Sequence, residues 1–90
     1  MVIERFRNRD AKAVYGRYHQ KGRMVPDGLK YIGSWTETNF DRCFQLMECD
    51  YQSLLDDWIA KWRDIVDFEV VPVMTGAEAA AIFGPKDRGR

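Results

Sequence analysis

Hydrophobic and polar positions divide the chain into four strand-like and two long helix-like segments. Alternation with a period of two is typical of a strand, and apolar residues spaced three and four apart are typical of an amphipathic helix. The strand-like segments are residues 1–6, 29–37, 42–49 and 67–74, and the helix-like segments are residues 11–21 and 52–66. This order predicts an α+β protein of the ferredoxin-like βαββαβ type, with a four-stranded antiparallel sheet and both helices on one face.

A short third helix is predicted near the C-terminus. Thr75 is followed three residues later by Glu78, which is the capping-box pattern, and then by the apolar run AAAIF. The helix is expected to end at Gly84. Residues 1–84 are therefore predicted to form a single domain, and residues 85–90 a disordered tail.

The hairpin formed by the second and third predicted strands has two dissimilar faces. With residues 38–41 as its loop, Glu37 pairs with Arg42, and this pair sets the register. One face then carries Tyr31, Gly33, Trp35, Phe44 and Leu46, and the other carries Lys30, Ile32, Ser34, Thr36, Cys43, Gln45, Met47 and Cys49. An uncovered face of an antiparallel sheet should be polar, because it meets water. Neither face of this hairpin is plainly polar. We therefore predict a homodimer that packs sheet to sheet, with the polar groups of the second face lining a cavity between the sheets.

The charge of the chain narrows the range of partners. Its 14 basic and 14 acidic residues cancel, and the strand RCFQLMEC lacks the basic and aromatic motif of RNA-recognition modules, so nucleic acid is not an expected partner. Residues 1–30 carry eight basic and three acidic residues. Either this basic first helix attracts a more acidic second helix, or Arg17, Lys21 and Arg23 form a local anion site.

Membrane association is not expected either. No apolar run reaches the ~18–20 residues of a membrane span, and the start MVIERF does not have the layout of a signal peptide. The expected location is the cytoplasm, where thiols stay reduced.

The cysteines and the histidine give no metal or redox site. Cys43 and Cys49 lie six residues apart in one predicted strand, which is about 20 Å at ~3.3 Å per residue. A disulfide requires a Cα separation of roughly 4.4–6.8 Å, so the two cannot pair. His19 is the only histidine and no CxxC pair is present, so no metal ligand set is predicted. Unreactive buried thiols are favoured over a reactive Cys43, and a solvated His19 at a helix end is favoured over a general base or a haem ligand.

Three further side chains have two interpretations each. Trp35 and Tyr31 fit either the core or the space between two sheets. Arg42 is most simply the partner of Glu37 at the end of the hairpin, and in a dimer cavity the same guanidinium would hold an anionic ligand. Trp58 and Trp62, four residues apart on the apolar face of the second helix, are predicted to be core residues.

The segments FDRCFQLMECD, SLLDDWIAKW and DFEVVPV resemble a family of short, mostly bacterial proteins known only as a domain of unknown function. That family is placed in the dimeric α+β barrel superfamily, so the resemblance, which covers nearly the whole chain, implies a ferredoxin-like protomer and a homodimer. Superfamily members include cofactor-free monooxygenases, haem-degrading enzymes, dye-decolourising peroxidases and stress-responsive proteins. None of their catalytic motifs matches this sequence residue by residue.

The sequence therefore supports two functional hypotheses and names no reaction. The first is binding of a small apolar or aromatic molecule in the cavity beside the sheet, with cofactor-free monooxygenase-like activity left open. The second is a non-catalytic structural or regulatory dimerisation module. No cofactor is expected, and the candidate ligand-binding residues are Tyr31, Ser34, Trp35, Arg42, Cys43, Gln45 and His19.

Overall fold

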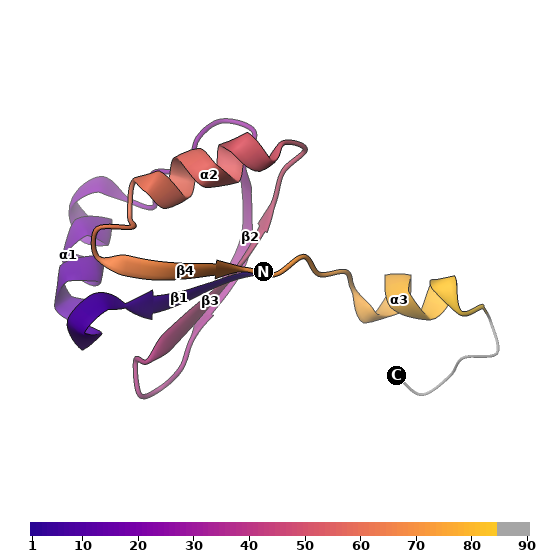
Figure 1. The fold of residues 1–90 in the computed structure, drawn as a ribbon, viewed down its shortest axis with the longest axis horizontal. Coiled ribbons are helices and arrows are strands. Elements are labelled where there is room, and N and C mark those ends of the chain that lie inside the picture. Colours follow the sequence, from indigo (N-terminus) through magenta and orange to yellow (C-terminus); the bar gives the residue numbers. More distant parts are fainter. Residues whose placement is uncertain (85–90) are drawn as a thin grey trace.

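The computed structural model describes residues 1–84 and shows an α+β fold with a four-stranded antiparallel sheet and three α-helices (Figure 1). The strands lie in the order β2-β3-β1-β4. The elements in chain order are β1 (Val2–Phe6), the 3-10 turn η1 (Arg7–Arg9), α1 (Ala11–Lys21), β2 (Lys30–Thr36), β3 (Arg42–Glu48), α2 (Gln52–Ala60), β4 (Val66–Val70) and α3 (Gly76–Ile82). The predicted tail, residues 85–90, lies outside the described part of the chain.

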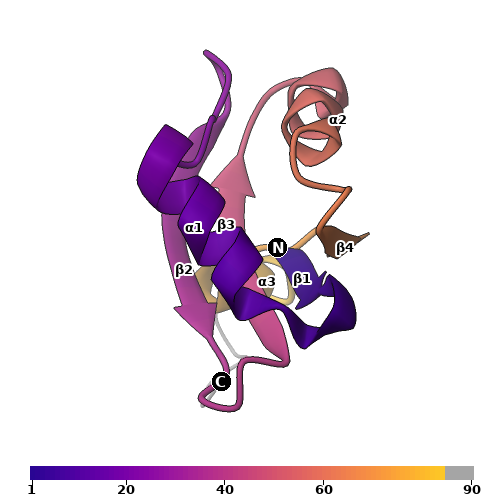
Figure 2. The same ribbon diagram turned by 90° about the vertical axis from the view of Figure 1, so that its left-hand side faces the viewer.

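Helices α1 and α2 lie on the same side of the sheet and enclose the core with it (Figure 1 and Figure 2). The core side chains come from every layer: Val2, Phe6, Leu29, Cys43 and Val66 from the sheet and its edge, Val14 from α1, and Leu55, Trp58 and Trp62 from α2 and the turn after it. Trp58 and Val66 are 1% and 0% exposed. The prediction that both long helices cover one face is confirmed.

Local signals set the helix ends. The Asp10 carboxylate accepts a hydrogen bond from the Ala13 amide at 3.1 Å and caps α1. Gly22 ends α1 in the positive-φ conformation that glycine adopts without strain. The predicted capping box of α3 is confirmed, because Thr75 accepts from the Glu78 amide and Glu78 accepts from the Thr75 amide.

The predicted second helix is too long at its C-terminal end. It stops at Ala60, a turn follows, and Val66 begins β4 instead of ending a helix. A contact from α1 lies at the point where the helix stops. Arg17 Nη1 donates to the Lys61 carbonyl at 3.0 Å, and the Ile65 amide, which a continuing helix would direct at that carbonyl, donates to Trp62 instead. Strand β4 ends at Val70, so Pro72 lies beyond it rather than within it.

The hairpin register is confirmed at its loop end only. Ser34 lies opposite Gln45, and Thr36 opposite Cys43, as predicted. A bulge at Ile32 then shifts the register, so that Tyr31 lies opposite Met47 and moves to the face that the helices cover. The prediction that Tyr31 shares a face with Trp35 is therefore wrong, because one extra residue exchanges the faces of a strand.

The other face of the sheet carries a row of apolar side chains across three strands. Ile3 lies opposite Phe44, and Phe44 lies opposite Trp35. The Trp35 ring extends over Gly33, where a Cβ atom would meet the ring at 3.3 Å, and it is still 58% exposed. We call Ile3, Trp35, Phe44 and Leu46 the open face.

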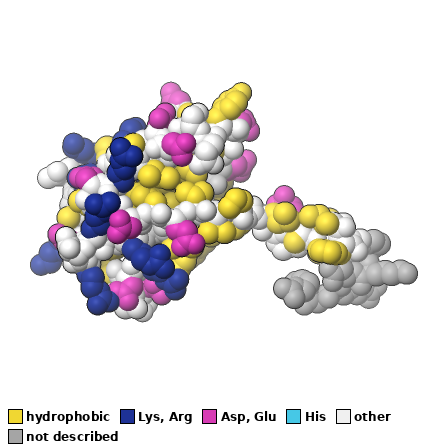
Figure 3. All heavy atoms as spheres, in the orientation of Figure 1, with side chains coloured by type: hydrophobic (Ala, Val, Ile, Leu, Met, Phe, Trp, Pro, Cys, Tyr) yellow, Lys and Arg dark blue, Asp and Glu magenta, His cyan; other side chains and the backbone are white. Residues whose placement is uncertain are grey.

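A C-terminal arm, residues 72–84, leaves the sheet beside the N-terminus. The Met1 amine donates to the Val71 carbonyl at 2.7 Å, and beyond this point the chain extends away from the body and ends in α3 (Figure 1). Apolar side chains are displayed along the arm (Figure 3). Val73, Met74, Ile82 and Phe83 are all more than half exposed.

Candidate functional site

A cavity of about 160 Å³ lies between the two long helices and the sheet. Its walls are mainly aromatic and come from Phe6, Tyr15, Tyr18, Trp58 and Trp62. Its polar groups are Glu4, Arg23, Ser34, Thr36, Cys43 and Gln45. These polar side chains belong to the sheet, except Arg23, which lies in the loop after α1. The cavity thus has aromatic sides and a polar floor.

Glu4 is the acidic group of this floor. It lies on β1 between Val2 and Phe6 on the helix-covered face and is only 4% exposed. Gln45 Nε2 donates a hydrogen bond to Glu4 Oε2. Burial raises the pKa of Glu4 from 4.5 to about 7, since the Gln45 hydrogen bond and the nearby charge of Arg23 offset only part of the desolvation. A carboxyl with this pKa exchanges its proton near neutral pH.

Gln45 connects this carboxyl to Arg23. Arg23 Nε donates to Gln45 Oε1 at 2.9 Å, which directs the amide nitrogen of Gln45 towards Glu4. The guanidinium carbon of Arg23 lies 3.8 Å from the centre of the Tyr31 ring and 5.3 Å from that of Tyr18. Both tyrosines are partly exposed, at 38% and 39%. The guanidinium therefore stands between two aromatic rings at the solvent edge of the cavity.

Two tryptophans hold the backbone at Arg23. Trp58 Nε1 and Trp62 Nε1 donate to the Arg23 carbonyl at 2.9 and 3.1 Å. A carbonyl oxygen has two lone pairs, so it accepts both bonds. The loop after α1 is thereby fixed to α2 and the turn after it.

A second polar chain crosses the floor. The hydroxyls of Tyr15 and Thr36 lie 3.2 Å apart, and Thr36 Oγ1 donates to Cys43 Sγ at 3.6 Å. Burial raises the pKa of the Cys43 thiol, so at neutral pH it stays protonated. Both cysteines are free.

We predict that alkylating reagents label Cys49 before Cys43 in the folded protein. Cys49 is half-buried, whereas Cys43 is 8% exposed and its thiol is held in the protonated, unreactive form. Peptide mass spectrometry after a timed iodoacetamide pulse measures both rates, with urea-unfolded protein as the reference in which the two thiols react alike. Faster labelling of Cys43 in the folded protein would contradict this assignment.

The structure brings together some of the predicted ligand-binding residues and separates others. Ser34, Cys43 and Gln45 line the cavity, and Tyr31 adjoins it through Arg23. These groups lie beneath the helices of one protomer, so the expectation that they face a space between two sheets is wrong. The polar floor points to the helix-covered side because Cys43 and Gln45 lie opposite the inward residues of β1.

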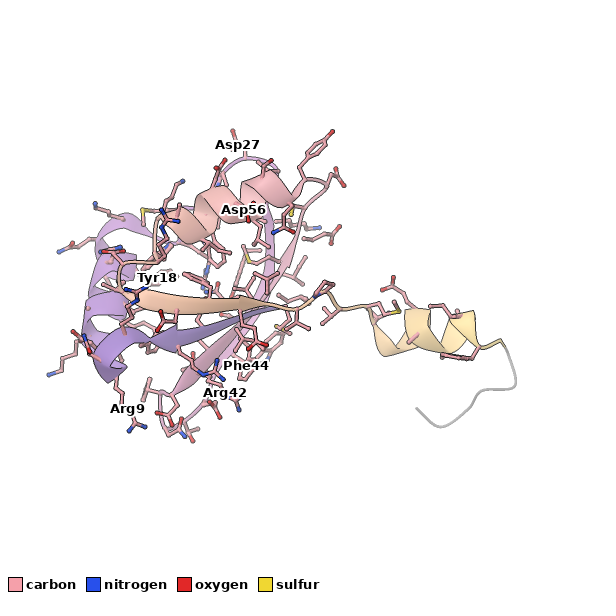
Figure 4. The ribbon with its side chains drawn as sticks, in the orientation of Figure 1. Arg9, Tyr18, Asp27, Arg42, Phe44 and Asp56 are labelled. Atoms are coloured by element: carbon pink, nitrogen blue, oxygen red, sulfur yellow. The ribbon has the colours of Figure 1, made fainter. Side chains whose placement is uncertain are left out.

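The remaining three candidates are outside the cavity lining. Trp35 is on the open face. Arg42 and Phe44 lie on the side of the sheet away from α2 (Figure 4), and Arg42 Nε donates to Glu37 at 2.7 Å, which confirms the predicted hairpin pair. His19 is exposed on α1, its ring 5.7 Å from that of Tyr18.

Glu4 is not among the predicted site residues, and Arg23 is predicted only in the alternative anion site with Arg17 and Lys21. A signal for Glu4 was present: in the segment VIERF, alternation places this acid on the same face as Val2 and Phe6. A charged residue on an apolar strand face is a buried-site candidate. Arg23 was recognised only within a basic cluster, and the sequence does not show that it meets Gln45.

No group of three or more His, Cys, Asp or Glu side chains that could hold a metal ion occurs within residues 1–84. In the same residues, no helix is long and apolar enough to cross a membrane.

Comparison with known proteins gives a family and no activity. A family model described as a domain of unknown function (DUF3303) matches residues 1–87. No curated protein and no solved structure matches the chain.

Proposed function

The chain belongs to the DUF3303 family, whose function is unknown, and we propose from the cavity that it binds a small single-ring aromatic molecule. The observation that carries this proposal is the partly open cavity of about 160 Å³ with aromatic walls. An apolar cavity of about 150 Å³ holds one benzene ring. Flat rings also gain edge and face contacts with aromatic side chains.

The polar floor favours a ring that carries a polar substituent. Well-placed polar groups in an otherwise apolar pocket fix the orientation of a ligand. Here the carboxyl of Glu4, the amide of Gln45 and the hydroxyl of Ser34 all belong to the sheet side. The ring would lie against the helices and direct its substituent towards the sheet. The family resemblance suggests an activity on such a ring, namely cofactor-free monooxygenase-like chemistry, and we include it in this proposal.

The assembly is part of the proposal. The strand order β2-β3-β1-β4 and the element order β-α-β-β-α-β support a ferredoxin-like protomer. The open face supports a homodimer, because Trp35 is 58% exposed within a continuous apolar row. Charges of both signs border this row, including Arg42 with Glu37 and Arg5 with Glu69. A surface of this kind can pair with its own copy about a two-fold axis. The same observation favours the second candidate function, a dimerisation module without a ligand.

We predict that phenol binds to the protein and that Val14→Phe weakens binding at least about tenfold, or ~1.4 kcal/mol. Val14 lines the cavity from α1, and a phenyl group there fills the space that the ring needs. Titration calorimetry measures the affinity, and native mass spectrometry reports the number of chains and any bound molecule. Val73→Phe is the matched control, since it adds the same bulk on the exposed arm.

Three outcomes separate the proposals. Phenol binding that Val14→Phe removes and Val73→Phe leaves unchanged supports the ring site. A dimer that binds no phenol or related ring favours the dimerisation module. A monomer contradicts the role assigned to the open face.

A further inference from the structure

We propose that Glu4 is a catalytic base that takes a proton from a hydroxyl group on the bound ring, and that Arg23 stabilises the ring oxyanion that results. This inference rests on the proposed function, because it requires a ring in the cavity. It names the substrate class, a single-ring phenol, and it assigns the reacting group on the protein.

One carboxylate oxygen of Glu4 is held in place and the other faces the cavity. Oε2 accepts the hydrogen bond from Gln45. Oε1 accepts no hydrogen bond from any side chain of residues 1–84. In the same residues, every fully buried side-chain oxygen or nitrogen has a hydrogen-bond partner. Oε1 must therefore be accessible, and the cavity is the space that Glu4 lines. A hydroxyl on a bound ring has an acceptor there.

Arg23 has donors to spare for a negative charge. Within residues 1–84 its guanidinium donates one side-chain hydrogen bond, from Nε to Gln45 Oε1 at 2.9 Å. The two terminal nitrogens remain for a ligand, and stacking on Tyr31 at 3.8 Å fixes the plane in which they lie. The side-chain amide of Gln45 bridges the guanidinium and Glu4. The positive charge is thus close to the position where proton transfer to Glu4 would leave an oxyanion.

The other elements around Glu4 add no second fixed charge. In the described part of the chain, the charged or titratable groups that line the cavity with it are Arg23 from the loop, Tyr15 and Tyr18 from α1, and Cys43 from β3. From β4, Phe68 lies opposite Glu4, and α2 and its following turn contribute Trp58 and Trp62. With the pKa of Glu4 at about 7, slightly alkaline solution provides the ionised base.

The proposed step is a balanced proton transfer. The O–H bond of the ring hydroxyl breaks and its electron pair stays on the ring oxygen, while an O–H bond forms at Glu4 Oε1. The site keeps its net charge, because one negative charge moves from Glu4 to the ring. Glu4 returns the proton to solvent when the ring leaves. The product of the step is a phenolate, the electron-rich form of the ring.

A nitrophenol reports this transfer directly, because its phenolate absorbs at longer wavelength than the neutral phenol. We choose 3-nitrophenol and a pH between the pKa of Glu4 and that of the free ligand. Bound to the wild-type protein, the phenolate band is expected to appear without net proton release, which calorimetry in two buffers of different ionisation enthalpy measures. In Glu4→Gln the ionised fraction of the bound ligand should fall about tenfold, which corresponds to one pKa unit.

The variants are chosen to keep the fold. The amide oxygen introduced by Glu4→Gln can still accept from Gln45, and Glu48→Gln makes the same chemical change at an exposed position. Arg23→Gln should lower the ionised fraction, whereas Glu48→Gln should leave it unchanged. An equal ionised fraction in wild type and Glu4→Gln overturns the base assignment while the binding proposal stands. No nitrophenol or phenol binding to either protein overturns both.

Discussion

The free energy of unfolding of the wild-type protein is expected to decrease as the pH rises from about 4.5 to 7, and Glu4→Gln is expected to abolish this decrease. The Glu4 carboxyl has a pKa of about 7 in the folded protein against 4.5 when unfolded. Between these values the folded state holds a proton that the unfolded state has released, so the free energy of unfolding decreases as the pH rises. The interval corresponds to about 3 kcal/mol, a large fraction of the ~5–15 kcal/mol that stabilises a small domain.

Urea unfolding from pH 4 to 8 measures this effect. The difference in the free energy of unfolding between wild type and Glu4→Gln reports the titration of Glu4 alone, because the carboxyls with lowered pKa are present in both proteins. Asp64, whose pKa its bond to Arg17 lowers to about 2, stabilises the folded state at neutral pH and loses this contribution on acidification. Glu48→Gln should follow the wild-type curve. Parallel curves for wild type and Glu4→Gln would mean that Glu4 has the same pKa in the folded and the unfolded protein, which would contradict this prediction.

The helices and strands, their caps and the hairpin pair could be predicted from the sequence. The order of four strands and two long helices, the cap at Asp10 and the capping box at Thr75 all depend on residues that lie close together in the chain. The pair of Arg42 with Glu37 belongs to the same group, because a hairpin loop sets it. Such features depend on local sequence, so a single sequence contains the information for them.

The features that were missed depend on contacts between distant segments. Arg17 binds the carbonyl of Lys61, which lies 44 residues away, and the helix there ends earlier than its apolar pattern indicates. Gln45 meets Glu4 across a separation of 41 residues. The bulge at Ile32 lies next to Gly33, and an isolated glycine within a strand pattern is a signal for a bulge, but the hairpin loop alone does not specify the shifted register. The cavity itself follows from how two helices pack on the sheet, and no periodicity encodes that spacing.

The largest single loss of stability is expected from Trp58→Ala, at about 3–5 kcal/mol. Trp58 is 1% exposed, and its ring meets that of Phe68 edge to face at 5.9 Å. Truncation leaves a large space between α2 and the sheet and removes one of the two indole donors to the Arg23 carbonyl. Urea unfolding monitored by circular dichroism measures the change. A loss below about 1 kcal/mol would show that α2 does not depend on this side chain.

A double-mutant cycle tests whether the two indoles share one acceptor. Trp58→Phe keeps most of the apolar volume and should cost about 1 kcal/mol, because Trp62 Nε1 still bonds the Arg23 carbonyl at 3.1 Å. Trp62→Phe should cost about the same, because Trp58 Nε1 still bonds the Arg23 carbonyl. The double variant leaves the carbonyl without either donor, so its cost should exceed the sum of the two by about 1–2 kcal/mol. Additive costs would show that solvent replaces the lost bonds. Excess cost would show that the tryptophans act together to fix the loop, and with it the Arg23 side chain that reaches Gln45 beside Glu4.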